Sequence, residues 1–331
     1  MKKTNFSTKH IQQIIVVAAI ILFIIKIGAY YLTNSVAVLT DALESIVNVV
    51  ASLIGLYSII LSSKPRDENH PYGHRKIEFI SSAIEGILIA IAGVVIIYES
   101  IINLLHPHQL ANLDLGILLI AFSAIVNYVL GWWCKIHGTK NASPVLIGTG
   151  VHLQSDTYST IGLIVGIIIL KLTDLFWLDS AVAILFAFII IFSGYKILRR
   201  SLSGIMDESD LKVVEKIIEL LNKNRKPTWI DVHNLRVIDY AGFYHVDCHL
   251  TVPYYLNINE GHAIMDELTD VLKNGFENNI EFFIHIDGCI EQQCVLCQVN
   301  NCNYRKSDFA ANFPWTQKTL LSNAKHTLVQ N

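Results

Sequence analysis

Six long apolar runs occupy the chain up to about residue 198, and they limit what it can fold into. A helix needs about 20 apolar residues to cross the hydrocarbon core of a bilayer. Each run is long enough for one crossing, and short polar breaks separate them. We therefore predict an α-helical membrane protein whose six transmembrane helices lie at residues 11–32, 36–61, 78–104, 113–134, 145–171 and 176–198.

The composition changes after the sixth run. The whole chain is 52% hydrophobic and only 16% charged, whereas an ordinary soluble domain is about 25% charged. From Met206 onward Asp, Glu, Lys, Asn and His become frequent. We expect a six-span transmembrane domain at 1–206, a water-soluble domain at 207–288 and a cysteine-rich tail at 289–331. The net charge of −3 gives no indication of a nucleic-acid partner.

Basic residues in the short loops predict how the chain is oriented in the membrane. The N-terminal tail carries three lysines, and the loop after the second run is also rich in Lys and Arg. The loops after the first and third runs contain neither. We therefore expect a multi-pass protein of the cell (inner) membrane with both termini in the cytoplasm. The first run is too long for the apolar core of a cleaved signal peptide.

The soluble part alternates between two periodicities. Residues 210–223 and 260–274 have the pattern of amphipathic helices, whereas 230–239, 243–252 and 280–286 read as strands. This order predicts a small α+β domain with an αββαβ, ferredoxin-like arrangement.

Two of the apolar runs carry polar and ionisable groups, which are costly inside a bilayer and therefore usually functional. The second run contains TDALESIVN and the fifth contains HLQSD. In each, two polar residues four positions apart share one helical face, and two opposed faces would surround one divalent transition metal with N and O ligands. The alternative is hydrogen bonding between helices or a water-lined cavity. The predicted ligands are Glu44, Asn48, His152 and Asp156, with Asp41 in a supporting position.

The loop after the second run gathers further ligand types in the string DENHPYGH. It places Asp67 three residues before His70, and His74 four residues after it. This spacing predicts a metal site formed by Asp67, His70 and His74, with a solvated loop of unrelated histidines as the alternative.

The soluble domain and the tail each contain a second kind of ligand set. The domain carries several histidines on or near the expected strands, and we predict metal binding there rather than packing or surface roles: His233, His249, His262, His285 and Asp287. In the tail, four cysteines at C-x4-C-x2-C-x4-C spacing predict a zinc site or an iron–sulfur cluster, with unligated thiols as the alternative. These are Cys289, Cys294, Cys297 and Cys302.

Taken together, these segments resemble the cation diffusion facilitator family, from the first run to Asp287. The matching strings are LESIVNVVAS, KPRDENHPYGHRKIE, HLQSD, DVHNLR, HVDCHL and IHID. The resemblance implies a homodimer of six-span subunits that exports divalent cations across the lipid bilayer in exchange for protons. Such a protein is a secondary active transporter that works by alternating access, not an enzyme.

The resemblance also assigns the candidate residues. It places the transport site at Glu44, Asn48, His152 and Asp156, and it treats the loop and cytoplasmic groups as further metal sites. Lys76 and Asp207 match a charged pair near the family's dimer interface. The four-cysteine tail lies outside the family's common core.

The transport site departs from the family's usual pattern at two positions. The pair in the second span is most often Asp/Asp or His/Asp, whereas this chain has Glu44 and Asn48. Zinc is the first expectation for the cargo, with iron(II), manganese, cobalt and cadmium as alternatives, because N and O ligands serve all of these ions. The rival hypothesis is a membrane-anchored metal or redox sensor that uses the cytoplasmic His and Cys sites. A metal-dependent membrane enzyme has no supporting motif.

Overall fold

The computed structural model describes residues 8–33, 36–105, 113–173, 176–277, 279–300 and 302–327. Within the membrane helices, some side chains lie outside this description, among them those of Asp41 and Glu44. The chain divides into two compact units, Met1–Met206 and Asp207–Asn331.

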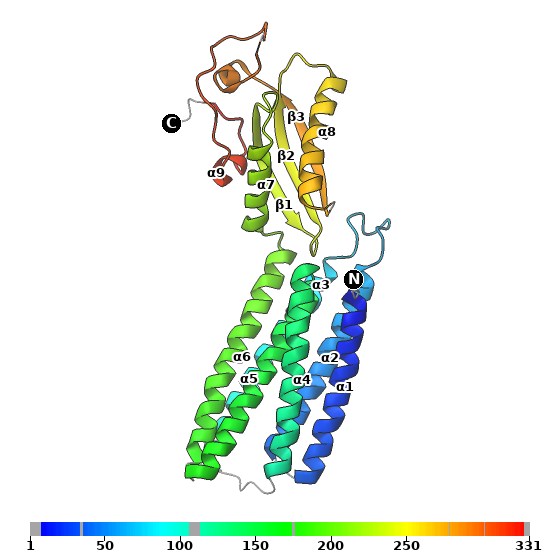
Figure 1. Ribbon diagram of the computed structural model, residues 1–331, viewed down its shortest axis with the longest axis vertical. Helices are drawn as coiled ribbons and strands as arrows, with labels where there is room; N and C mark the ends of the chain where they lie inside the picture. The colour runs from blue at the N-terminus through cyan, green and yellow to red at the C-terminus, as the bar shows by residue number, and fades with distance from the viewer. Residues whose placement is uncertain are drawn as a thin grey trace, which may run out of the picture. The chain divides into compact units, whose positions relative to one another are not determined.

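The first unit consists of six long helices that run alongside one another as a bundle (Figure 1). Their apolar sequences explain both their length and the many large hydrophobic side chains exposed on them, since lipid replaces water around such a surface. The prediction of a helical transmembrane domain is confirmed. The helices are α1 (Thr8–Thr33), α2 (Val36–Ser62), α3 (Ile77–Leu105), α4 (Leu113–Lys140), α5 (Pro144–Thr173) and α6 (Phe176–Ile205).

Among the described side chains, three stretches are long and apolar enough by themselves to cross a membrane: Thr8–Gly28, Ile77–Ile102 and Ile117–Lys140. A shorter apolar stretch covers Asn48–Ser62 in α2. The side chains in parts of α2, α5 and α6 lie outside the described residues.

Glycines set how closely the membrane helices pack. A Cβ atom added to Gly194 in α6 would lie 2.7 Å from the carbonyl oxygen of Gly86 in α3. A Cβ on Gly150 in α5 would lie 2.8 Å from the carbonyl oxygen of Gly131 in α4. Small residues let two helix backbones approach directly, which favours van der Waals packing inside a bilayer. These two crossings hold α3 against α6 and α4 against α5.

The second unit contains the predicted α+β domain. Its elements follow the expected order: α7 (Leu211–Lys223), β1 (Asp231–Asp239), β2 (Tyr244–Val252), α8 (Ile258–Gly275) and β3 (Ile280–Gly288). The sheet has the order β1-β2-β3, with β1 antiparallel and β3 parallel to β2. The parallel pair requires a crossover, and α8 supplies it. A bulge interrupts β1 between His233 and Arg236.

Amphipathic helices and alternating strands produce the core of this unit. Asp210 caps the start of α7 by accepting a hydrogen bond from the backbone N–H of Lys212, and Asn257 and Glu260 form a capping box on α8. The apolar face of α7 packs into the same core as the inward side chains of the sheet.

The C-terminal segment after β3 also packs on this unit. It contains a short 3-10 helix, η1 (Glu291–Leu296), and one turn of helix, α9 (Gln317–Leu320). Trp315 and Leu320 are buried in the core, and the guanidinium of Arg225 lies 3.9 Å from the Trp315 ring centroid. The Arg225 side chain also donates to the carbonyl oxygen of Phe313. The segment that was predicted to be a cysteine-rich tail is therefore anchored to the second unit by buried aromatic and apolar side chains.

Candidate functional site

Three of the four predicted intramembrane ligands meet between α2 and α5. The Asn48 side-chain amide donates to Asp156 Oδ2 at 2.5 Å, and its oxygen lies 2.5 Å from His152 Nε2. His152 Nε2 is also 3.6 Å from Asp156 Oδ2. All three residues are buried, with relative exposures of 8%, 4% and 6% in sequence order. An imidazole nitrogen, a carboxylate and an amide oxygen therefore share one point inside the helix bundle.

The other two predicted residues of this group are Asp41 and Glu44, whose side chains lie outside the described part of α2. The backbone of α2 is helical from Val36 to Ser62. Glu44 therefore precedes Asn48 by four helical positions, a spacing that puts two residues on the same face.

Lys26 of α1 lies beside this group, and its place in an apolar run suggested a side chain that either reaches the membrane surface or pairs with a carboxylate. Its side chain is buried. Together with Ser45, Asn48 and Asn127 it lines a small cavity of about 10 Å³, close to the volume of one water probe. A lysine within an apolar run was the only signal in the sequence that could have pointed to this position.

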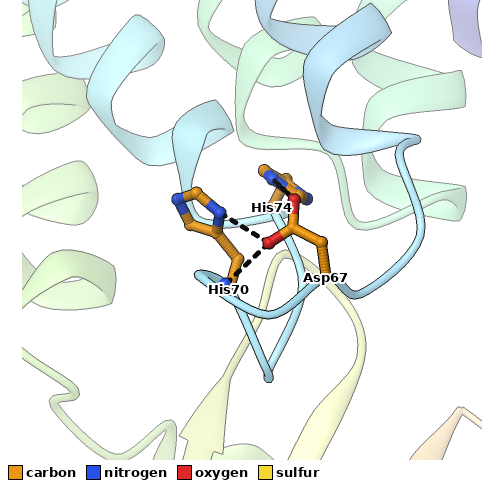
Figure 2. A group of neighbouring side chains, drawn as sticks. All are labelled: Asp67, His70 and His74. Carbon is orange, nitrogen blue, oxygen red and sulfur yellow. Dashed lines mark hydrogen bonds and ion pairs between the residues drawn. The ribbon is translucent and has the colours of Figure 1, made fainter.

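The loop between α2 and α3 forms a second group of ligand atoms (Figure 2). Asp67 Oδ1 lies 3.0 Å from His70 Nδ1 and Asp67 Oδ2 lies 3.2 Å from His74 Nε2. A tight turn makes this arrangement possible: the Gly73 N–H donates to the His70 carbonyl oxygen at 2.9 Å, and Gly73 has a φ of 88°, which glycine adopts without steric cost.

The carboxylate of this loop group is held in its charged form. A side-chain hydrogen bond with His70 is the main cause that lowers the pKa of Asp67, and the backbone N–H of His70 adds to it. Asp67 and His70 are both about half exposed, whereas His74 is largely buried. The three ligand atoms lie within 4.8 Å of one another. An ionised carboxylate between two imidazoles can bind a divalent cation.

In the second unit, the sheet register brings three predicted histidines into one row. His233 on β1 is opposite His249 on β2, and His249 is opposite His285 on β3. The ring centroids of the two pairs are 5.0 and 4.7 Å apart. Asp287 lies beside the row, with its Oδ2 3.0 Å from His249 Nδ1 and 3.5 Å from His233 Nε2.

As in the loop group, the ligand atoms of His233, His249 and Asp287 lie within 4.8 Å of one another. His285 Nε2 is 3.7 Å from Asp287 Oδ1. His262 does not belong to this group; it is exposed on α8, and its ring lies 3.9 Å from Asp266. Lys76 and Asp207 belong to the two different units of the chain.

The C-terminal segment reaches this histidine row, which the sequence did not predict. Lys325 Nζ lies 3.4 Å from Asp287 Oδ1 and donates to the Gly288 carbonyl oxygen at 3.0 Å. Burial alone would raise the pKa of Asp287, but the hydrogen bond with His249 and the charge of Lys325 outweigh it and the pKa is lowered. A lysine ammonium therefore occupies one side of a carboxylate that was predicted to bind metal.

Behind the row lies Asp231, a fully buried carboxylate. His326 donates its backbone N–H to Asp231 Oδ2 at 2.9 Å, and its ring Nδ1 is 2.7 Å from Oδ1. Burial would raise the pKa of Asp231, but the nearby His233 ring and the hydrogen bonds with His326 overcome this and lower the pKa to about 2. Asp231 thus links a predicted ligand, His233, to the end of the chain.

The four tail cysteines are free thiols that line one cavity of about 440 Å³. They are not among the groups of three or more described ligand atoms that gather within 4.8 Å. The four cysteines therefore share one cavity, but their sulfur atoms do not have a spacing that would fit a single small ion, and the predicted cysteine metal site stays a prediction.

Both units match models of known protein families. Residues 13–206 match the cation efflux transmembrane domain, and residues 210–289 match the cytoplasmic domain of cation efflux proteins. All three intramembrane residues that meet between α2 and α5 lie in the first match, and the histidine row lies in the second.

Similar proteins span most of this chain. An uncharacterized transporter from Synechocystis is 29% identical over 74% of this chain and 79% of its own length. The manganese efflux system protein MneP of Bacillus subtilis is 25% identical, over 86% of this chain and 97% of its own. A cadmium, cobalt and zinc/H(+)-K(+) antiporter of Bacillus velezensis is 24% identical, over 83% of this chain and 88% of its own length.

Proposed function

The chain belongs to the cation diffusion facilitator family of divalent-metal efflux transporters, and on this premise we propose that it exports a divalent transition-metal ion in exchange for protons. The proposed transport site comprises Asn48, His152 and Asp156, with Glu44 as the fourth ligand and Asp41 in support. The observation that carries this proposal is the direct, buried contact of Asn48 with both His152 and Asp156 between two membrane helices.

Chemistry supports proton coupling at this site. Carboxylate and imidazole ligands must be deprotonated to bind a metal, so protons and cations compete for the same atoms. His152 Nε2 and Asp156 Oδ2 are 3.6 Å apart, close enough for both to face one ion or to share hydrogen bonds when it leaves. His152 is the proposed proton carrier, because an imidazole titrates near physiological pH.

Alternating access would then follow from the position of the site between helices. A cation from the cytoplasm binds Asn48, His152 and Asp156, the helices rearrange, and protons from outside displace the cation. Small-residue contacts such as Gly86 with Gly194 allow helices to lie close together without interlocked side chains.

Zinc is our first choice of cargo, and iron(II), manganese, cobalt and cadmium remain candidates. The relatives do not decide the matter, since a manganese system and a cadmium, cobalt and zinc antiporter are 25% and 24% identical to this chain. The amide of Asn48 supplies a neutral oxygen where the family most often has a carboxylate. This change lowers the negative charge around the ion. Because nitrogen and oxygen ligands serve every ion in this series, the ligand types do not favour one of them.

We further propose that the chain works as a homodimer in the cell (inner) membrane, with both termini in the cytoplasm. The match to the cytoplasmic domain of cation efflux proteins supports this assembly. Metal at the row His233, His249, His285 and Asp287 would help join two subunits, with His262 as a separate, exposed ligand on α8, and Asp67, His70 and His74 would form the loop site. Lys76 and Asp207 are proposed as the charged pair near the interface, and the tail cysteines as a separate soft-metal site.

Transport can be tested with the purified protein in sealed vesicles. We expect an imposed pH gradient to drive uptake of zinc, and we expect Asp156→Asn to reduce the initial rate at least tenfold. Glu99→Gln is the matched control, because it also removes a carboxylate from a membrane helix but lies at an exposed position. A competition series with the other divalent ions would rank the cargo.

Two results would contradict the proposal. Equal uptake by the wild type and Asp156→Asn would exclude this carboxylate from the transport site. Uptake that is unchanged when the pH gradient is collapsed would exclude proton exchange. A chain that binds cations but never moves them would instead fit the sensor hypothesis, which the family match does not favour.

A further inference from the structure

We propose that Cys289, Cys294, Cys297 and Cys302 bind an iron–sulfur cluster in the second unit of the chain, as a resident cofactor that is separate from the cargo sites. This inference does not depend on the transport proposal. Both family matches end at or before residue 289, so the segment that carries the other three cysteines lies beyond them.

The fold brings four cysteines from separate turns to one cavity. Cys289 directly follows β3, and its backbone N–H donates to the carbonyl oxygen of Val252 at the end of β2. Cys294 lies in η1 and Cys297 closes it, with the Cys297 N–H donating to the Cys294 carbonyl oxygen. One side of the cavity is therefore fixed to the end of the sheet, and η1 supplies two more of its cysteines.

Polar groups lie beside the sulfur atoms. The Lys306 backbone N–H donates to Cys294 Sγ at 3.5 Å, and Tyr254, Val299 and Tyr255 influence the thiols of Cys289, Cys297 and Cys302 in that order. Hydrogen bonds to the sulfurs stabilise the negative charge of thiolate ligands and tune the potential of clusters.

Arg305 holds the loop that carries the cysteines. Its guanidinium donates to the carbonyl oxygens of Cys294, Cys297 and Val299 at 3.0, 2.8 and 2.9 Å. Three hydrogen bonds from one planar group fix the curvature of the loop. They also place a permanent positive charge beside the cysteines, where a cluster with four thiolates would carry net negative charge.

The dimensions favour a cluster over a single zinc ion. Four thiolates around zinc at about 2.3 Å would have sulfur atoms only about 3.8 Å apart. The described cysteine sulfurs form no group of three within 4.8 Å, and their cavity has a volume of about 440 Å³. The C-x4-C-x2-C spacing of Cys289, Cys294 and Cys297 is the one found in plant-type [2Fe–2S] ferredoxins.

Aromatic rings cover one side of the cavity. Tyr254 and Tyr255 contact the ring of Tyr304, with centroid distances of 5.4 and 5.3 Å, and all three line the cavity. These tyrosines are themselves partly exposed, and solvent exposure is one of the factors that set the potential of a cluster.

Assembly balances without electron transfer when the iron is ferric. For a two-iron cluster, two ferric ions and two sulfide ions combine with four cysteine thiols. Four iron–thiolate bonds and four iron–sulfide bonds form, four S–H bonds break and four protons leave to water. The product has a net charge of −2, as expected from two ferric ions, two sulfides and four thiolates.

The test is the iron and acid-labile sulfide content of the full-length protein purified without oxygen. We expect iron and sulfide in equal amounts, at least two of each per chain, with visible absorption and an EPR signal after reduction. Cys294→Ser and Cys302→Ser should each lower the sulfide content at least fivefold. Cys134→Ala is the matched control, because Cys134 is a free cysteine in the first unit and should leave the sulfide unchanged.

Labile sulfide separates this cofactor from iron carried as cargo. The variant Asp156→Ala should lose transport and keep its sulfide, so the two proposals fail independently. One zinc ion per chain without sulfide would overturn the cluster assignment, and so would a protein that contains no metal at these cysteines. Sulfide that persists in both Cys→Ser variants would also overturn it.

Discussion

Lys325 provides the sharpest test of the proposed metal site on the sheet of the second unit. Its ammonium lies 3.4 Å from Asp287 Oδ1, and the same carboxylate contacts two proposed ligands, His233 and His249. A metal ion that uses Asp287 must displace this ammonium or share the carboxylate with it. Lys325→Met removes the charge but keeps the length of the side chain, so we expect metal to bind more tightly in the variant.

The size of the effect follows from the distance and the exposure of the pair. Two unit charges 3.4 Å apart interact by roughly 1 kcal/mol in water and roughly 5 kcal/mol at an effective dielectric constant of 20. The two side chains are 26% and 18% exposed, so solvent and side-chain entropy reduce the gain towards the lower value. We expect about 1–2 kcal/mol, which corresponds to a gain in affinity of about 5- to 30-fold.

Cobalt binding to the full-length protein in detergent would measure this change, because the absorption of cobalt reports its ligands. Asp67→Ala and Asp156→Ala would first be introduced to silence the loop and transport sites, and Cys294→Ser and Cys302→Ser to silence the cysteine site. Lys318→Met is the matched control, since Lys318 is an exposed lysine on the same segment. The difference between Lys325→Met and its parent should shrink as salt is raised, because salt screens exposed charges.

Equal or weaker cobalt affinity in Lys325→Met would refute this reasoning. Weaker binding would mean that Lys325 mainly holds the segment in place through its bond to the Gly288 carbonyl oxygen. Tighter binding in the control as well would point to a general effect of net charge.

Two further predictions concern stability. Asp231→Asn should weaken the hydrogen bonds that its buried carboxylate accepts from His326, at a cost of roughly 2 kcal/mol of stability. Hydrogen exchange of the β1 amides should then speed up roughly 30-fold. The control Asp266→Asn, at an exposed position, should leave the exchange rates unchanged. Gly194→Ala would put a Cβ 2.7 Å from the Gly86 carbonyl oxygen and should cost about 1–3 kcal/mol, seen as a lower melting temperature. Gly28→Ala, which meets nothing within 4 Å, should not lower it.

The sequence predicted the helices and strands to within a few residues, because hydrophobic periodicity is a local property. The first apolar run was expected at 11–32 and the helix covers Thr8–Thr33. The first strand was expected at 230–239 and lies at Asp231–Asp239. Helix ends differ most where polar residues continue a helix beyond the membrane, as in α6, which was expected to end at 198 and ends at Ile205.

The contact between α2 and α5 was predictable only in part. The spacing of four residues placed His152 and Asp156 on one face of a helix. Nothing in the sequences TDALESIVN and HLQSD alone required that face to contact Asn48. The resemblance to a known family supplied that expectation. The histidine row is different, since its alignment depends on register: the bulge after His233 decides which β1 residue lies opposite His249.

The docking of the chain end could not be predicted, because it depends on contacts far apart in sequence. Trp315 and Leu320 enter the core from a segment without helical or strand periodicity, so no local pattern marks them as buried. Once they are in place, the bulged backbone of β1 presents the Asn234 N–H to the Ser322 carbonyl oxygen at 2.6 Å. That bond aligns the next few residues and brings His326 onto Asp231. A buried carboxylate thus orders the segment whose lysine contacts Asp287, the neighbouring proposed metal ligand.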